Sequence, residues 1–209
     1  MTPDLQSEFQ SLSEAAMQQL KAVPEIGSYR HVFSLCVTPS FTPAYRCTVY
    51  APLPFAKGAQ PFASFTIWRS DLDHDRLRTP VERLRHPKDL SPTIVEDTLG
   101  LTDADVEGFQ QRMRGISVPL YLGPATFVGC DGTAFEFRCD EMFYGASLHW
   151  WECEPAGWRP FTAVVVQIVS ELETRRKGKD QHLLHPSAVS AAAPTVALLS
   201  RDKPLSSVE

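Results

Sequence analysis

Glu136 and His149 have the chemistry of a proton-transfer pair and lie in two neighbouring segments, 133–139 and 144–151, in which apolar and polar side chains alternate. A carboxylate that orients a histidine is an arrangement used for general acid–base catalysis. Ser147 lies on the same predicted strand face as His149. The sequence therefore nominates Glu136 and His149 as the acid–base pair of a small hydrolase or transferase. No nucleophile elbow, glycine-rich phosphate loop or HExxH motif supports that chemistry independently.

The same strand face fits a second interpretation, a surface that binds a partner protein. Arg138 and Trp151 share this face with Glu136 and His149, and Arg159 follows at the start of a predicted helix. Tryptophan and arginine contribute much of the binding energy in protein interfaces. Because no catalytic signature accompanies this group, binding is favoured over catalysis. We therefore predict a non-enzymatic binding protein with Glu136, Arg138, His149, Trp151 and Arg159 as partner-binding residues, and keep the acid–base enzyme as the alternative.

Residues 71–82 contain the acidic positions of a calcium-binding EF-hand loop. Asp71, Asp73, Asp75 and Glu82 occupy the ligand positions, but Arg76 stands where the loop needs a glycine for its sharp turn. No helix is predicted before this segment. Pro80, Pro87 and Pro92 rule out a long helix in this region, so we expect short helical turns on a solvated, salt-bridged surface rather than a calcium site.

Cys130, Cys139, His149 and Cys153 have the residue types of a zinc site. The expected hairpin places Cys130 at the turn and Cys139 at the far end of the same strand pair, too far apart to bind one ion. The same separation excludes a disulfide between these two cysteines. We predict no metal and no cofactor.

A hairpin is expected to position the candidate residues. Asp131-Gly132 separates two alternating runs, which is a strong turn signal because both central positions need positive φ. This turn would pair residues 133–139 with residues 126–130, and a second turn around residues 140–143 would set Cys139 near Tyr144. Side chains alternate between the two faces of a strand. The polar face then carries Glu136, Arg138, Ser147, His149 and Trp151, and the core face carries Val128, Phe135, Phe137, Tyr144, Ala146, Leu148 and Trp150.

The remaining chain predicts an α+β protein. Residues 29–37, 45–50 and 62–68 are rich in β-forming side chains. Apolar residues at helical spacing predict helices from Pro3 to about Leu20, from Thr102 to Gly115, and from Pro160 to Leu172. We predict an antiparallel sheet of about six strands with helices packed mainly on one face. Residues 1–174 would form a single domain and residues 175–209 a mobile tail.

Composition limits the functional classes. The net charge is −5; six Lys/Arg against three Asp/Glu from Arg175 onward give the tail +3 and leave −8 on the body. An acidic body argues against a nucleic-acid-binding surface, in spite of the basic run at residues 175–179, and suits a basic protein partner. No apolar stretch is long enough to span a membrane. Five irregularly spaced cysteines and the lack of an export signal predict free thiols and a cytoplasmic location.

One segment resembles known proteins. Asp131-Gly132-Thr133-x-x-Glu136, followed by Trp150-Trp151-x-x-x-Pro155-x-x-Trp158-Arg159-Pro160, is similar to the C-terminal half of small bacterial α+β proteins. Some proteins of that kind resemble immunity proteins, which bind and silence a cognate toxin. The resemblance covers residues 126–172 and names no catalytic residues. It implies a possible role as an inhibitor of a partner protein.

Overall fold

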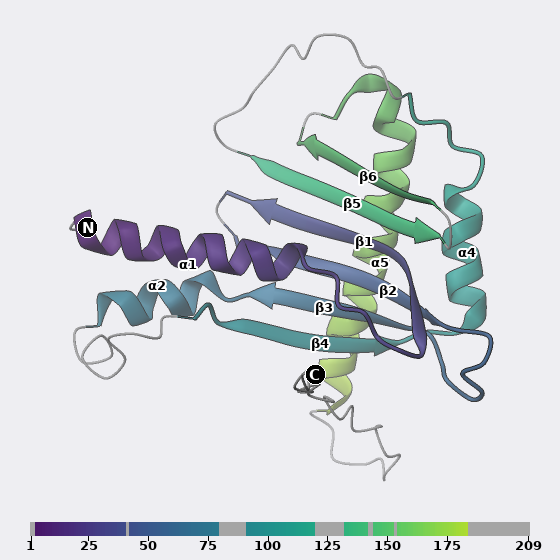
Figure 1. Cartoon of the computed structure of the whole chain (residues 1–209), viewed down its shortest axis with the longest axis horizontal. Coiled ribbons are helices and arrows are strands. Elements are labelled where there is room, and N and C mark those ends of the chain that lie inside the picture. The colour runs from purple at the N-terminus through teal and green to yellow at the C-terminus, as the bar shows by residue number, and fades with distance from the viewer. Residues whose placement is uncertain are drawn as a thin grey trace, which may run out of the picture.

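The computed structural model describes residues 3–40, 42–79, 91–119, 132–141, 144–152 and 154–183. Its centre is a six-stranded antiparallel sheet with the strand order β4-β3-β2-β1-β5-β6 (Figure 1). The strands are β1 (Tyr29–Pro39), β2 (Tyr45–Pro52), β3 (Phe62–Trp68), β4 (Ile94–Gly100), β5 (Thr133–Glu141) and β6 (Tyr144–Trp151). The predicted α+β class and the antiparallel sheet are confirmed.

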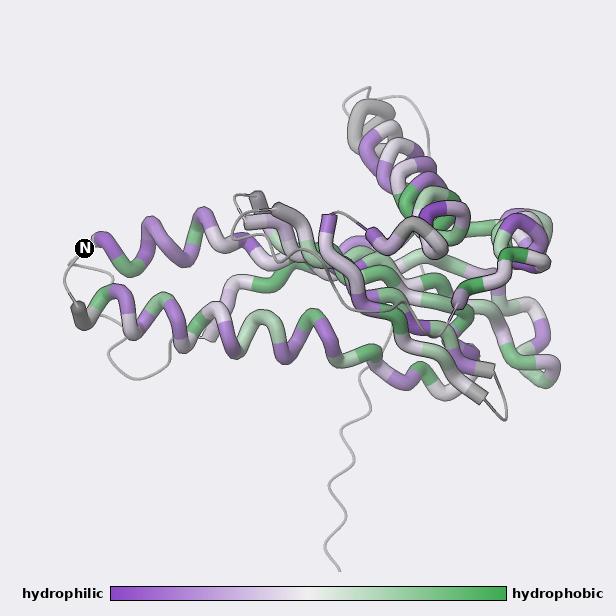
Figure 2. The backbone as a smooth tube through the Cα atoms, turned by 90° about the horizontal axis from the view of Figure 1, so that it is seen from above, coloured by the Kyte–Doolittle hydropathy of each residue, from purple (hydrophilic) through white to green (hydrophobic). Residues whose placement is uncertain are grey.

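Helices lie on both faces of the sheet. One face is covered by α4 (Asp103–Met113) and α5 (Arg159–Leu183), which the short helix η1 (Ala156–Trp158) precedes. The other face carries α1 (Pro3–Lys21), with α2 (Ser70–Arg78) packed beside it. Seen from above, the sheet lies between α1 and α5, and hydrophobic and hydrophilic residues alternate along both helices (Figure 2).

The main core lies between the sheet and α5. The expected apolar stripe of this helix is buried against the strands, with Val165, Ile168 and Leu172 fully enclosed. Phe137 of β5 meets the Phe161 ring edge-on, at 4.9 Å between ring centroids. Each such side chain contributes about 1.5–3 kcal/mol by leaving water. The β-branched residues of α5 are therefore held in a helix by packing rather than by intrinsic propensity.

A buried arginine fixes the end of α1 on the opposite face. Arg46 of β2 is 3% exposed, and burial lowers the pKa of its guanidinium. It donates hydrogen bonds to the carbonyls of Gln19, Leu20 and Ala22 and to the Thr66 hydroxyl. The last carbonyls of a helix lack partners within the helix and carry partial negative charge. Arg46 satisfies them, and thereby sets where Lys21, the last residue of α1, lies.

The hairpin predicted at residues 126–139 does not form. Both edges of β5 are already paired, with β1 on one side and β6 on the other, so residues 133–139 have no free edge for residues 126–130. Gly132 does have a positive φ of 147°. Residues 120–131, which include the predicted first strand, lie outside the described residues.

β5 and β6 pair antiparallel as predicted, but with a shifted register. Glu141 pairs with Tyr144, whereas we expected Cys139 in that position. A shift of two residues leaves every side chain on its original face, because faces alternate with a period of two. The predicted division of β5 and β6 into a polar and a core face is therefore confirmed by the register.

The charged segment after β3 is more ordered than we expected. Residues 70–78 form the helix α2, and Asp73 is completely buried rather than solvated. Its carboxylate accepts hydrogen bonds from Trp68 Nε1 at 2.8 Å and from the backbone nitrogen of Thr93 at 2.9 Å, and it pairs with Arg76. A buried charge must be neutralised by such partners. Residues 80–90 lie outside the described part of the chain.

Helix α5 continues beyond Thr174, where we expected the ordered domain to end. Its last nine residues, 175–183, begin with the basic run that we assigned to a mobile tail. Arg175 pairs with Asp105 of α4 and Arg176 pairs with Asp97 of β4. These long-range pairs tie the extension to the domain. Residues 184–209 lie outside the described residues, so the predicted tail stays a prediction there.

Candidate functional site

One row of side chains crosses all six strands on the face that carries α1. We call it the polar row, and from β4 to β6 it consists of Glu96, Thr66, Arg46, Cys36, Glu136 and His149. Glu136 and His149 are therefore direct cross-strand neighbours. Residues in this relation have adjacent Cβ atoms, so their side chains interact.

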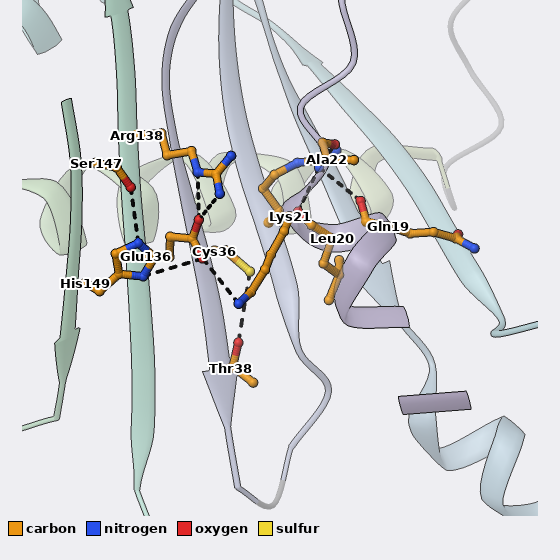
Figure 3. Close-up of polar contacts among 11 residues, drawn as sticks. Gln19, Leu20, Lys21, Ala22, Cys36, Thr38, Glu136, Arg138, Ser147 and His149 are labelled. Carbon is orange, nitrogen blue, oxygen red and sulfur yellow. Dashed lines mark hydrogen bonds and ion pairs between the residues drawn. The ribbon is translucent and has the colours of Figure 1, made fainter. Parts of the chain in front are cut away.

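Glu136 is the centre of a cluster of charged and polar groups (Figure 3). Its Oε1 accepts a hydrogen bond from Arg138 Nε at 2.6 Å and pairs with a second nitrogen of the same guanidinium. Its Oε2 lies 3.6 Å from Lys21 Nζ and 3.6 Å from His149 Nδ1. The other ring nitrogen of His149 lies 3.2 Å from Ser147 Oγ.

In this cluster the carboxylate is buried, whereas the side chains that surround it are partly exposed to solvent. The Glu136 side chain is 7% exposed, whereas the side chains of Lys21, Arg138 and His149 are 51%, 40% and 61% exposed. A buried carboxylate needs charge-assisted hydrogen bonds, and the two contacts with Arg138 provide them. Leaving His149 aside, two permanent cations surround one anion. The cluster therefore presents net positive charge to solvent on a protein of net charge −5.

Trp151 borders the cluster, and its indole ring packs closely against Gly132. A Cβ atom at position 132 would lie 2.8 Å from Trp151 Nε1, and the φ of 147° at this residue is also unfavourable for a side chain. Glycine is thus required where the indole packs. Trp151, His149, Glu136 and Lys21 together line a hollow of about 350 Å³.

Of the five residues predicted to bind a partner, four come together. Glu136, Arg138, His149 and Trp151 share one face of β5 and β6. Arg159 does not join them in the described contacts: it is the first residue of α5, which packs on the opposite face, and its side chain pairs with Glu154.

Four further residues of the site escaped the sequence analysis. Lys21, Cys36, Thr38 and Ala134 line the hollow with Glu136, although Lys21 and Cys36 are more than 90 residues from it in the chain. Burial raises the pKa of the Cys36 thiol, which keeps it protonated and weakly nucleophilic. The only local signal was the position of Lys21 near the predicted end of the first helix.

In a catalytic triad, Ser147 would be the nucleophile, His149 its general base and Glu136 the carboxylate that orients the base. The distance of 3.2 Å from Ser147 Oγ to His149 Nε2 allows a hydrogen bond. The 3.6 Å between His149 Nδ1 and Glu136 Oε2 is longer than a hydrogen bond, and Glu136 is already engaged by Arg138. The Glu136 carboxylate therefore interacts more strongly with Arg138 than with His149.

Within the described part of the chain, no three His, Cys, Asp or Glu side chains approach closely enough to hold a metal ion. Asp71, Asp73 and Asp75 of the EF-hand pattern lie on helix α2 rather than in a loop, and the carboxylate of Asp73 is already hydrogen-bonded. Glu82 of the pattern lies outside the described residues. Cys130 and Cys153 of the zinc pattern lie outside the described residues. Cys36 and Cys47 are free cysteines.

The basic run at residues 175–179 is largely engaged in ion pairs. Arg175 and Arg176 pair with acidic residues of α4 and β4, and Lys177 pairs with Glu173 one turn away on α5. No helix in the described residues combines the length and apolar character needed to cross a membrane.

Comparison of the chain with models of protein families, with curated proteins and with solved structures gives no match.

Proposed function

We propose that this protein is a non-catalytic binding protein that holds a partner protein on the exposed part of its polar sheet face. The surface consists of Arg138, Ser147, His149 and Trp151 around the buried Glu136, and we call it the polar patch. The observation that carries the proposal is the contact of one buried carboxylate with two exposed side chains, Arg138 on its own strand and His149 on the adjacent strand.

The patch is organised before any partner arrives. Glu136 holds Arg138 through two contacts, His149 lies between Glu136 and Ser147, and Trp151 packs on Gly132. Side chains fixed in advance lose less conformational entropy when a partner binds. Arginine and tryptophan are also the residue types that most often dominate binding energy. Both properties favour a recognition surface over a solvated strand face.

The charge of the patch together with the adjoining Lys21 favours an acidic partner surface. The whole chain carries −5, which suits a basic partner, but Lys21 and Arg138 outnumber the one carboxylate of the cluster. Complementary potentials accelerate association and set orientation. We therefore expect carboxylates of the partner to face Arg138 and Lys21.

Affinity capture with matched charge reversals tests the proposal. Tagged wild-type protein, Arg138→Glu and Arg159→Glu are expressed in the cells of origin, and captured proteins are quantified by mass spectrometry. Arg159→Glu is the control because it reverses an arginine at the start of α5, on the other face. We expect a protein that is captured by the wild type and by Arg159→Glu but is reduced at least tenfold, about 1.4 kcal/mol, with Arg138→Glu. Equal capture by all three variants would contradict the proposal.

A hydrolase is the second candidate, favoured by the 3.2 Å contact between Ser147 Oγ and His149 Nε2. A fluorophosphonate probe tests it because such probes label serines that a neighbouring base activates. The binding proposal predicts no labelling of Ser147. Labelling that is present in the wild type and lost in His149→Gln would instead support the enzyme.

An immunity-type inhibitor is one form of the proposed binding protein. The resemblance of residues 126–172 supports this form, and the free thiols Cys36 and Cys47 suit the reducing bacterial cytoplasm. Co-expression with the product of the adjacent gene tests it. Growth rescued by the wild type and not by Arg138→Glu is the expected outcome, and a toxic neighbour that the wild type does not neutralise would count against it.

A further inference from the structure

The hollow beside the polar patch has a floor built from two rows of three side chains. On β1, β5 and β6, the polar row contributes Cys36, Glu136 and His149, and the next row contributes Thr38, Ala134 and Trp151. Ala134 lies in the middle of the second row, and its single methyl group leaves space between larger neighbours. The small side chain is therefore the reason that the sheet face is hollowed here.

Lys21 closes one side of this floor. Its side chain extends from the end of α1 toward Glu136 (Figure 3). The hollow is open to solvent, and its volume of about 350 Å³ falls within the range of about 300–1,000 Å³ that small-molecule sites occupy. The hollow is therefore large enough for a small molecule rather than only for water.

Two side-chain nitrogen atoms at the hollow make only long contacts with Glu136. Lys21 Nζ and His149 Nδ1 approach the same oxygen, Glu136 Oε2, and both distances are 3.6 Å. Good hydrogen bonds to a carboxylate are about 2.7–2.9 Å long. Arg138 makes the short contacts with Glu136 and neutralises its charge. The ammonium of Lys21 therefore faces the hollow without a close acceptor in the described contacts.

The two rows of the hollow differ in character. Lys21 and His149 lie beside Glu136 on the polar row, and Ala134 and the Trp151 indole form an apolar, flat wall on the next row. An anionic group suits the side of Lys21, and a planar apolar body packs on an indole. A ligand with an ammonium group is disfavoured because Lys21 and Arg138 exceed the single carboxylate in charge.

We propose that the hollow binds a small molecule that carries one carboxylate or phosphate group next to a flat apolar body. Its anionic group would contact Lys21 Nζ on the side away from Glu136, and its body would lie against Trp151 and Ala134. This site would serve a small ligand whether or not a protein partner uses the polar patch.

Calorimetric titration with simple probes tests the charge requirement. Benzoate and phenyl phosphate present the two anionic groups on the same ring, and benzamide is the uncharged match of benzoate. We expect saturable binding of at least one anion, at least tenfold tighter than that of benzamide. The anion that binds more tightly, benzoate or phenyl phosphate, identifies the preferred anionic group. Equal binding of benzamide and both anions, or no saturable binding of either anion up to about 10 mM, would overturn the inference.

Three variants locate the binding. Lys21→Gln removes one cation and should weaken anion binding about tenfold, as expected for a partly exposed charge pair. Ala134→Leu fills the hollow and leaves the charges in place, so it should abolish binding. Lys57→Gln removes an exposed lysine from the β2–β3 loop at the other end of the sheet, and binding should stay within about twofold of the wild type.

The outcomes separate this inference from the proposed function. Anion binding that survives both Lys21→Gln and Ala134→Leu refutes the site even if affinity capture still depends on Arg138. Anion binding that both variants abolish supports the site even if no protein partner is captured. A thermal melt of each variant tests whether loss of fold causes the change in binding. We expect both variants to stay folded, because Lys21 and Ala134 are at least partly exposed.

Discussion

Replacement of Arg46 by methionine removes the cation that fixes the end of α1. Methionine keeps most of the length and apolar surface of the side chain and deletes the guanidinium. The carbonyl of Leu20 loses a buried hydrogen bond of 2.7 Å, and those of Gln19 and Ala22 lose bonds at half-buried positions. The Thr66 hydroxyl loses its partner at 3.0 Å.

The expected cost follows from these four contacts. A buried group left without a partner costs about 1–3 kcal/mol, and here the carbonyl of Leu20 and the hydroxyl of Thr66 are the buried ones. The other two carbonyls can bond to water after a small movement of the chain. Removal of a buried charge returns part of the loss, since burial already lowers the pKa of Arg46. We expect a net destabilisation of about 2–4 kcal/mol, or a fall in Tm of about 5–15 °C for a protein of this size.

Urea unfolding followed by tryptophan fluorescence measures this change. Arg114→Met is the control, because Arg114 is an exposed arginine at the end of α4 and its loss should cost no more than about 0.5 kcal/mol. Arg46→Lys should also destabilise, since one ammonium cannot donate to three carbonyls and a hydroxyl at once. Arg46→Met that is as stable as the wild type would refute the view that this guanidinium caps α1.

Three other predictions concern stability and reactivity. Asp73→Asn should destabilise the protein by about 2–4 kcal/mol, because it removes a fully buried anion from its donors, whereas the exposed Asp75→Asn should have little effect; urea unfolding compares them. Burial lowers the pKa of His31 in spite of its contact with Asp140, so its contribution to stability is complete above the ordinary histidine pKa of about 6.5 and is lost as pH falls through the folded value. The loss of unfolding free energy between pH 7.5 and 5 should therefore be smaller in His31→Gln, and an equal or larger loss would contradict this assignment. Burial also raises the pKa of the fully buried Cys47 thiol, so thiol labelling with mass spectrometry should find Cys47 modified only as fast as the domain unfolds.

The pairing of the candidate residues was predictable because it depends on alternation alone. Glu136 and His149 differ in sequence by 13 positions across one turn, and they stay on one face for any even shift in register. The prediction therefore survived an error of two residues in the turn. The hairpin predicted from Asp131-Gly132 was wrong because a turn motif is local. It carries no information about β1, which pairs with the edge of β5 that the hairpin would have needed.

The rest of the site depends on contacts between distant parts of the chain. Lys21 reaches Glu136 only because Arg46 holds the end of α1 over the sheet. Nothing near Lys21 or Arg46 in the sequence specifies that contact. Asp73 shows the same limit, since its charged neighbours indicated a solvated segment while Trp68 and Thr93 enclose it. Periodicity predicts faces, and tertiary packing decides which polar residues on them are buried.

Photo-crosslinking in cells tests the central claim, that the polar patch is the binding surface, most directly. A benzophenone amino acid replaces Ser147, an exposed residue of the patch, or Arg114, an exposed residue on the far side of the molecule. The account predicts one crosslinked protein from position 147, lost when Arg138→Glu is added, and none from position 114. A protein crosslinked from position 114 but not from position 147 would contradict it.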